Sequence, residues 1–271
     1  MSVQMEIICV GNELLIGKTL NTNAQWLAKR VISLGIAVKR ITVVGDDVDE
    51  IACAVREALE RNSRFIITTG GLGPTFDDKT LEGIAKAINR RLELNKKALK
   101  MVREKYEEYA KAGKIDVVEM TPHRVKMAKL PEGAEPLSNP VGTAPGVLIR
   151  IGDTDLFALP GVPTEMEAIF DKHVVDMLKK EAGDATFFEV SIYADDIMES
   201  ALAPLIDIAM HDNPYVYIKS HPRGAEKKPH IEIHLSTTAK DSKTAKDRIG
   251  KAIIQLSELI MEKGGKVKLK E

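Results

Sequence analysis

Ile66-Ile67-Thr68-Thr69-Gly70-Gly71-Leu72-Gly73-Pro74-Thr75-Phe76-Asp77-Asp78-Lys79-Thr80 is the stretch that decides the fold of this chain. Phe65 to Thr69 is short, apolar and rich in β-branched residues, and glycines follow it directly, which is typical of a central parallel strand. Beyond the glycines, an apolar stripe from Leu81 to Ile88 predicts a helix. We therefore expect a strand, a tight glycine loop and a helix in succession.

The glycine loop has the character of an anion-binding turn. Glycines let the backbone turn tightly and let a ligand approach it closely, and the N–H groups at a helix start point toward negative charge. The loop matches neither common phosphate motif, because no Gly-Lys-Ser/Thr follows and Phe76 stands where the dinucleotide pattern requires glycine. We expect a phosphate-binding loop of a separate type.

Asp77 and Asp78 give this loop two adjacent carboxylates. They would repel a phosphate unless a divalent cation lay between, so the pair indicates Mg²⁺ or a similar hard metal. The alternative is that both carboxylates cap the following helix, where the helix dipole favours negative charge.

Length and composition indicate a globular protein of two domains. The 271 residues exceed the rough prior of ~150 residues per domain. A net charge of −1 gives no electrostatic footprint for nucleic acid or an anionic membrane, so we expect neither partner. Two cysteines, the lack of a signal-peptide pattern and the lack of a long apolar run predict a cytoplasmic location.

The first half of the chain predicts an open parallel sheet. Strands at Met5 to Val10, Ile36 to Val44 and Phe65 to Thr69 alternate with helices, which demands parallel strands with helices on both faces. Ligands of such sheets bind outside the carboxyl ends of the strands. This places Gly11-Asn12-Glu13, Gly45-Asp46 and the glycine loop on one rim, where we expect an acidic site.

The remainder of the predicted first domain, residues 1–182, adds a charged helix from Glu93 to Ala112, and we expect His123 to be a structural or surface residue in preference to a metal ligand. The glycine-rich loop Asn139 to Gly146 leads into a predicted β-hairpin of Val147 to Ile151 and Leu156 to Leu159. Pro160-Gly161-Val162-Pro163 then ends a strand and begins a helix. Turn chemistry alone could explain either loop.

Residues 183–271 predict a small second domain. Its elements follow the order β-α-β-β-α-β of a ferredoxin-like module, with helices at Asp196 to Met210 and Thr238 to Lys263. The basic connection Ser220 to Pro229 contains Lys227 and Lys228 and is typical of a solvated hairpin tip, although it could also bind an anion.

A series of motifs resembles the CinA family in order across Glu6 to Phe170. They are Gly-Asn-Glu-Leu from Gly11, Asn-Thr-Asn from Asn21, Val-Val-Gly-Asp from Val43, the glycine loop, Asn-Pro-Val-Gly-Thr-Ala-Pro-Gly from Asn139 and Pro-Gly-Val-Pro from Pro160. The amino-terminal domain of that family is similar to the molybdopterin-binding domain of MogA, MoaB and gephyrin. The resemblance implies a three-layer, mostly parallel α/β domain that forms a homo-oligomer.

The resemblance also implies roles for individual residues. The acidic site residues would be Asp46 and Asp78, with Asp77 and Glu13 as further metal ligands for Mg²⁺, Mn²⁺ or Co²⁺, and a monovalent cation as a further candidate. The binding residues for a nucleotide or pterin would be Gly11, Asn12, Asn21, Gly70, Gly71, Gly73, Thr75, Asn139, Gly142, Thr143 and Ala144.

Two departures from the family pattern bear on function. Full-length CinA proteins continue into a nicotinamide mononucleotide deamidase domain, which we do not expect in this chain. The MogA-type loop usually has a basic residue where Asp77 stands, which favours metal binding over direct pairing with a pterin phosphate.

Three functions follow from the resemblance. The first is a metal-dependent pyrophosphatase acting on ADP-ribose-like nucleotides, in which metal-bound water attacks and loop N–H groups stabilise the developing charge. The second is a molybdopterin-binding or adenylyl-transfer protein of molybdenum cofactor biosynthesis, and the third is a non-catalytic module that senses a nucleotide.

Overall fold

The structure, a computed structural model, describes residues 3–183, 185–223 and 229–269. The chain divides into a first unit, Met1–Ile32 with Ile36–Glu181, and a second unit, Ser33–Gly35 with Ala182–Glu271. Lys227 and Lys228 of the predicted basic connection lie outside the described residues. Within the described ranges, no helix has the length and apolar character needed to cross a membrane.

The first unit is built on a mostly parallel sheet. Its strand order is β2-β1-β3-β8-β7-β6, in which β2, β1, β3 and β8 are parallel and the β7–β8 hairpin is antiparallel. The strands of this sheet are β1 (Gln4–Val10), β2 (Ala37–Val44), β3 (Phe65–Thr69), β6 (Glu135–Leu137), β7 (Gly146–Ile151) and β8 (Thr154–Leu159). The expected α/β fold class and the hairpin are confirmed.

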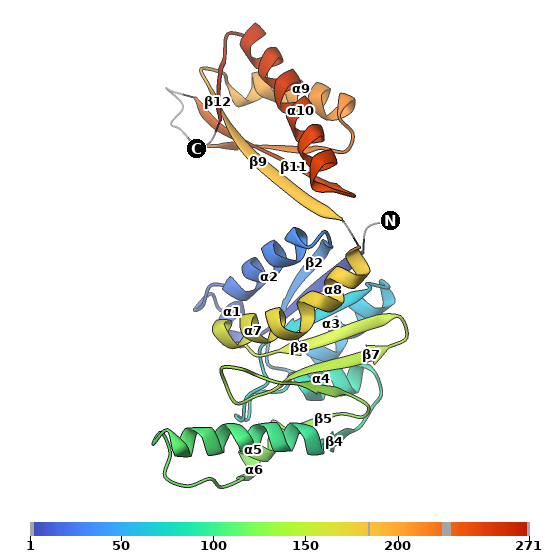
Figure 1. The fold of residues 1–271 in the computed structure, drawn as a ribbon, viewed down its shortest axis with the longest axis vertical. Coiled ribbons are helices and arrows are strands. Elements are labelled where there is room, and N and C mark those ends of the chain that lie inside the picture. The colour runs from blue at the N-terminus through green and yellow to red at the C-terminus, as the bar shows by residue number, and fades with distance from the viewer. Residues whose placement is uncertain (1–2, 184, 224–228, 270–271) are drawn as a thin grey trace. The chain divides into compact units, whose positions relative to one another are not determined.

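Helices cover both faces of this sheet, as Figure 1 shows, with α2, α7 and α8 on one face and α3 and α4 on the other. The helices and minor strands of the unit are α1 (Asn12–Leu15), α2 (Thr22–Ser33), α3 (Val48–Glu60), α4 (Thr80–Ala87), β4 (Leu92–Leu94), α5 (Lys96–Lys111), α6 (Pro122–Lys126), β5 (Lys129–Pro131), α7 (Pro163–Ile169), the π-helical turn η1 (Phe170–Val174) and α8 (Val175–Ala182).

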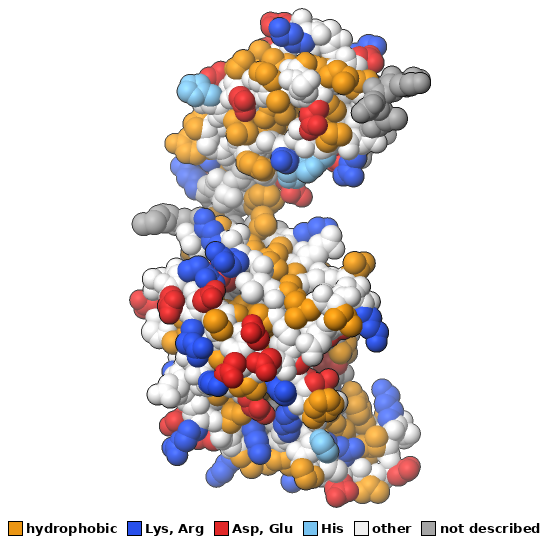
Figure 2. Space-filling view, turned by 180° about the vertical axis from the view of Figure 1, so that it is seen from behind, with side chains coloured by type: hydrophobic (Ala, Val, Ile, Leu, Met, Phe, Trp, Pro, Cys, Tyr) orange, Lys and Arg blue, Asp and Glu red, His pale blue; other side chains and the backbone are white. Residues whose placement is uncertain are grey.

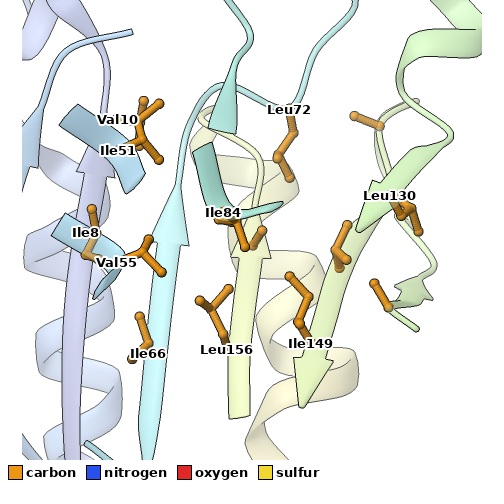
Figure 3. Close-up of a cluster of buried hydrophobic side chains, with 14 of the residues drawn as sticks. Ile8, Val10, Ile51, Val55, Ile66, Leu72, Ile84, Leu130, Ile149 and Leu156 are labelled. Carbon is orange, nitrogen blue, oxygen red and sulfur yellow. The ribbon is translucent and has the colours of Figure 1, made fainter. Parts of the chain in front are cut away.

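The core under α3 and α4 explains why the sequence around β3 dominates the fold. Alternate residues of a strand point to opposite faces, so Ile8 and Ile66 pack against Ile51 of α3 and Ile84 of α4. Figure 3 shows these side chains gathered with Leu156 of β8. All five side chains are at most 1% exposed, and this burial fixes the register of the central strands.

The second unit is a four-stranded antiparallel sheet with two helices on one face. Its order is β10-β11-β9-β12, and the α9 and α10 side chains pack on the apolar face of the sheet. The elements are β9 (Thr186–Asp195), α9 (Glu199–Asp212), β10 (Tyr217–Pro222), β11 (His230–Ala239), α10 (Ser242–Glu262) and β12 (Lys266–Leu269). The predicted β-α-β-β-α-β order is confirmed.

Several predicted boundaries were wrong, and local caps explain why. Asn95 accepts a hydrogen bond from the amide of Ala98, so the helix expected from Glu93 begins at Lys96 as α5. Asp241 caps α10 through the amide of Thr244, so Thr238 belongs to β11 and not to the helix. A capping side chain sets the first turn more firmly than an apolar stripe does.

On the face shown in Figure 2, Lys and Arg side chains are interspersed with Asp and Glu over the described residues, without a broad basic surface.

Candidate functional site

The loops that carry the predicted site residues all lie at the carboxyl edge of the parallel strands. Asn12 follows β1, Asp46 follows β2, the glycine loop follows β3, and Pro160 follows β8. The loop from Asn139 precedes β7, whose antiparallel pairing with β8 brings its start to the same edge. The edge is therefore a single rim assembled from five connections.

Direct contacts join the loops after β1 and β2. The amide of Asn12 donates to Asp46 Oδ2 at 2.8 Å, and the amide of Asp46 donates to Asn12 Oδ1 at 3.3 Å. An added Cβ on Gly45 would lie 2.6 Å from Asn12 Oδ1, so this pairing requires the glycine. Asp46 thus closes the rim by a reciprocal hydrogen bond to Asn12.

Gly70 occupies the tightest point of the rim. It has a φ of +103°, and an added Cβ would lie 2.2 Å from the carbonyl oxygen of Val10. An added Cβ on Gly161, after β8, would lie 3.3 Å from the Cα of Gly70. The loops after β1, β3 and β8 can meet here only because neither glycine has a side chain.

Thr80 holds the glycine loop closed. Its hydroxyl donates to the carbonyl oxygen of Gly70 at 2.7 Å, and its amide donates to that of Gly71 at 3.2 Å. An added Cβ on Gly71, whose φ is +65°, would lie 2.4 Å from Thr80 Oγ1. The sequence predicted Thr80 only as a residue at the start of the helix. Its hydrogen bonds to Gly70 and Gly71 could not be predicted, because they depend on the positive φ values of these two glycines.

Asp77 and Asp78 do not cap the helix, contrary to one expectation. α4 has Lys79 at its N-cap position and no side-chain cap, whereas Asp78 Oδ2 accepts from the amide of Thr75 at 2.8 Å. The Thr75 hydroxyl lies within hydrogen-bond distance of both carboxylates. The hydrogen bond from the Thr75 hydroxyl lowers the pKa of Asp77, and the positive charges of Lys126 and Lys79 lower it further.

The glycine loop presents backbone donors beside cationic side chains. Within the described residues, the amides of Gly71, Leu72 and Gly73 have no hydrogen-bond acceptor. Lys126 and Lys129 line the hollow next to this loop together with Gly71, Gly73 and Asp78. The Lys126 ammonium donates to the carbonyl oxygen of Thr75. Amides without acceptors and nearby ammonium groups favour an anionic ligand group, while the Asp78 and Glu82 carboxylates in the same hollow oppose it.

His123 contacts this loop. Its Nδ1 lies 3.1 Å from the carbonyl oxygen of Pro74.

Asn139 organises its own loop with both ends of its amide. Its Nδ2 donates to Ala144 O at 2.8 Å and to Glu165 Oε2 at 2.7 Å, and its Oδ1 accepts from the amide of Gly142 at 2.8 Å. Thr143 contacts Met127 through its hydroxyl at 3.9 Å. Asn139 is 8% exposed, so its side chain shapes the loop from within.

Sequence reasoning missed Glu165. An added Cβ on Gly142 would lie 2.0 Å from the Glu165 carboxyl carbon, so this side chain packs directly on the loop. The available signal was an acidic residue in the first turn of α7, which also fits a helix-dipole role.

A cavity of about 100 Å³ lies beside Gly70 on the other side of the rim. Cys9, Glu13, Asn21 and Asn23 are among the residues that line it. Burial raises the pKa of the Cys9 thiol, while a hydrogen bond with Asn21 opposes that rise. Asn21 Oδ1 accepts from the amide of Ala24 at 3.0 Å, so the side chain of this predicted binding residue also caps the first turn of α2.

The predicted metal ligands are not assembled into a metal site. Asp46 and Asp78 accept hydrogen bonds from backbone amides, Asp77 is bound to Thr75, and the Glu13 carboxylate folds back against Gly11. Among the described residues, no three His, Cys, Asp or Glu side chains are grouped for metal binding. In this arrangement the carboxylates of the predicted set do not converge on one point among the described residues, and the metal ligands stay a prediction.

Comparison with known proteins identifies the family. The model of a family described as a probable molybdopterin-binding domain matches residues 6–180. A protein of Sulfurisphaera tokodaii is 44% identical over 265 residues, covering 97% of each chain. A protein of Pyrobaculum arsenaticum is 46% identical over 260 residues, covering 96% of this chain and 95% of the relative.

Among solved structures, a similar one is the crystal structure of CinA from Thermoplasma acidophilum, whose function is described as unknown. It is 44% identical, has a TM-score of 0.59, and the similarity covers 65% of this chain and 98% of that chain. The resemblance to CinA seen in the sequence is thereby confirmed. The chain belongs to the family of probable molybdopterin-binding domains.

Proposed function

We propose that the first unit binds a phosphorylated pterin of the molybdopterin type, or a nucleotide of similar chemistry, at the carboxyl edge of its sheet. One observation carries the proposal: the amides of Gly71, Leu72 and Gly73 lack acceptors among the described residues. A phosphate placed there would receive N–H donors and lie near Lys126 and Lys129, whose ammonium groups oppose the repulsion from the Asp78 and Glu82 carboxylates in the same hollow.

Family membership favours a pterin as the ligand. Binding is favoured over the pyrophosphatase hypothesis because the carboxylates of Asp46 and Asp78 are engaged in hydrogen bonds within the rim. The pyrophosphatase would need these side chains to release their amides and converge on a metal. Binding needs no such rearrangement of the described residues.

The proposal is tested by equilibrium titration of the full chain with molybdopterin, ADP-ribose and AMP. We expect Gly73→Ala to weaken the binding of a phosphorylated ligand by about tenfold or more, because an added Cβ would lie 2.7 Å from Asp78 Oδ2 and push that carboxylate into the loop. Release of a fluorescent pterin from the denatured protein, after production in a host that makes the molybdenum cofactor, would support the pterin.

Gly250→Ala is the matched control, because Gly250 lies in α10 and has no atom within 4 Å of an added Cβ. Neither glycine has a positive φ, so neither variant introduces strain from a left-handed backbone. The proposal fails if no phosphorylated pterin or nucleotide binds below about 1 mM, which corresponds to a binding free energy near −4 kcal/mol. It also fails if both glycine variants bind as the unaltered protein does.

A further inference from the structure

The helix layer of the second unit has exposed apolar side chains on both of its helices. In α10, Ile254 and Met261 are 62% and 57% exposed, and in α9, Ile208 is 45% exposed. Single exposed apolar residues are ordinary on a protein surface, whereas a group of them on adjacent elements marks an interaction site. The positions of these three residues on the two helices decide between the two cases.

The three side chains lie together on the outer side of the helix layer. Ile254 and Met261 are seven residues apart, which is two helical turns, so they project from the same side of α10. α9 runs beside α10 at this point, because Gln255 Nε2 donates to Asp212 Oδ2 at 2.6 Å. Ile208 precedes Asp212 by one turn of α9. Ile208, Ile254 and Met261 therefore form one apolar surface, the outer helix patch.

Two charged side chains flank Ile254 on the same side of α10. Lys251 lies three residues before it and Glu258 four residues after it, and these spacings place both beside Ile254 on the helix surface. Both side chains are exposed. Within the described ranges neither forms an ion pair, and their separation of two turns, roughly 10 Å, is too long for them to pair with each other.

This order of charges is complementary to itself when a second copy of α10 lies antiparallel across the patch. A two-fold axis reverses the direction of the second helix, so Lys251 of each copy faces the last turns of the other. There it lies between Glu258 and Glu262, which are one turn apart. Asp247, one turn before Lys251, then lies beyond the end of the other helix and meets no carboxylate. A parallel arrangement would instead bring like charges together.

We propose that the outer helix patch is the interface of a homodimer in which the α10 helices of two copies pack antiparallel. Apolar contacts of Ile208, Ile254 and Met261 supply the affinity, and two symmetric pairs of Lys251 with Glu258 set the orientation. A second copy is the occupant that this chain itself specifies, because one surface provides both partners of each charge pair. The proposal does not depend on the ligand of the first unit.

Sedimentation velocity of the full chain and its variants, over a range of concentrations, measures the association. We expect a dimer with a dissociation constant in the micromolar range, because an interface of two helices from each copy is small. Lys251→Glu should weaken it by about tenfold or more, since the symmetry places a like-charge contact at both ends of the interface. Adding Glu258→Lys should recover at least about threefold, because it restores opposite charges at both ends while Glu262 stays negative.

Lys219→Glu is the matched control, because it makes the same charge change outside the patch. Lys219 is exposed on β10, and the preceding residue, Ile218, is buried in the core under the helices. Successive side chains of a strand point to opposite faces, so Lys219 lies on the face of the sheet away from the helices. This variant should leave the dimer affinity unchanged.

Cross-linking tests the proximity of the two patches directly. Cys53 is exposed and Cys9 is buried, so Cys53→Ser removes the accessible thiol. In that background, a short bismaleimide should join two copies of the Ile254→Cys variant into a covalent dimer. The Lys219→Cys variant should give none.

Three results would overturn the proposal. The first is a chain that stays monomeric up to about 1 mM. The second is an assembly that Lys251→Glu leaves unchanged, or in which Glu258→Lys fails to offset it, because association would then use another surface. The third is cross-linking of Ile254→Cys that is no faster than that of Lys219→Cys.

Discussion

Gly70→Ala should destabilise the first unit by about 3 kcal/mol, the sum of a left-handed backbone cost and a steric clash. The φ of Gly70 is +103°, and an added Cβ would lie 2.2 Å from Val10 O. That oxygen belongs to β1, which is paired with β2 and β3, so the backbone has little freedom to move aside. Chemical denaturation followed by circular dichroism measures the change in the free energy of unfolding.

Gly152→Ala separates strain from clash in this prediction. Gly152 lies in the turn between β7 and β8 with a φ of +56°, and nothing lies within 4 Å of an added Cβ. This control should therefore lose only about 1–2 kcal/mol, the cost of the backbone conformation. Equal stability of Gly70→Ala and Gly152→Ala would contradict the close contact between Gly70 and the Val10 carbonyl oxygen.

Arg61→Ala should destabilise the same unit by about 3 kcal/mol without touching the rim, because it leaves a buried carboxylate without its cation. Glu6 is 2% exposed, and its carboxylate accepts from Arg61 Nε at 2.9 Å and from Nη2 at 2.7 Å. The same hydrogen bonds raise the pKa of Arg61. Of these three donors to the Glu6 carboxylate, Arg61 Nε, Arg61 Nη2 and Ser63 Oγ, the variant would keep only Ser63 Oγ, which lies 2.9 Å from Glu6 Oε1.

Two further variants sharpen this result. Arg30→Ala removes an ion pair with Asp171 whose side chains are 40% and 52% exposed, so it should change stability by less than about 1 kcal/mol. Combining Glu6→Leu with Arg61→Leu should restore much of the loss, because apolar residues of similar volume do not need the pair. Equal effects of Arg61→Ala and Arg30→Ala would refute the account of a buried carboxylate.

The sequence predicted the parts of the fold that local pattern controls. β3 was located at Phe65 to Thr69 because an apolar, β-branched run was bounded by glycine, and its burial is complete at every position. The carboxyl-edge location of Asp46 and the glycine loop followed from the alternation of strands and helices. Both inferences need only periodicity and topology.

The sequence could not predict which polar atoms pair with one another. In the sequence, Asp77 and Asp78 fit a helix cap as well as they fit a metal site. In the folded chain, the turn of the glycine loop places Thr75 against them, and Thr75 forms hydrogen bonds with both carboxylates. Glu165 and Asn139 are separated by 26 residues, and only the completed β7–β8 hairpin brings them together.

The predicted metal ligands stay a prediction, and the structure shows what their carboxylates contact in the folded chain. Four carboxylates near one rim suggest a hard cation, but each has a nearer partner in the folded chain. Proximity in topology is therefore insufficient, and the direction of each side chain decides whether ligands converge.

Hydrogen–deuterium exchange of the full chain, with and without a saturating phosphorylated pterin, tests the central claim most directly. The account predicts slower exchange in the glycine loop from Gly70 to Thr80, where the amides of Gly71, Leu72 and Gly73 lack acceptors within the described part of the chain, with unchanged exchange at the β7–β8 turn around Gly152. Protection at that turn with none in the glycine loop would contradict a ligand site at the carboxyl edge of the sheet.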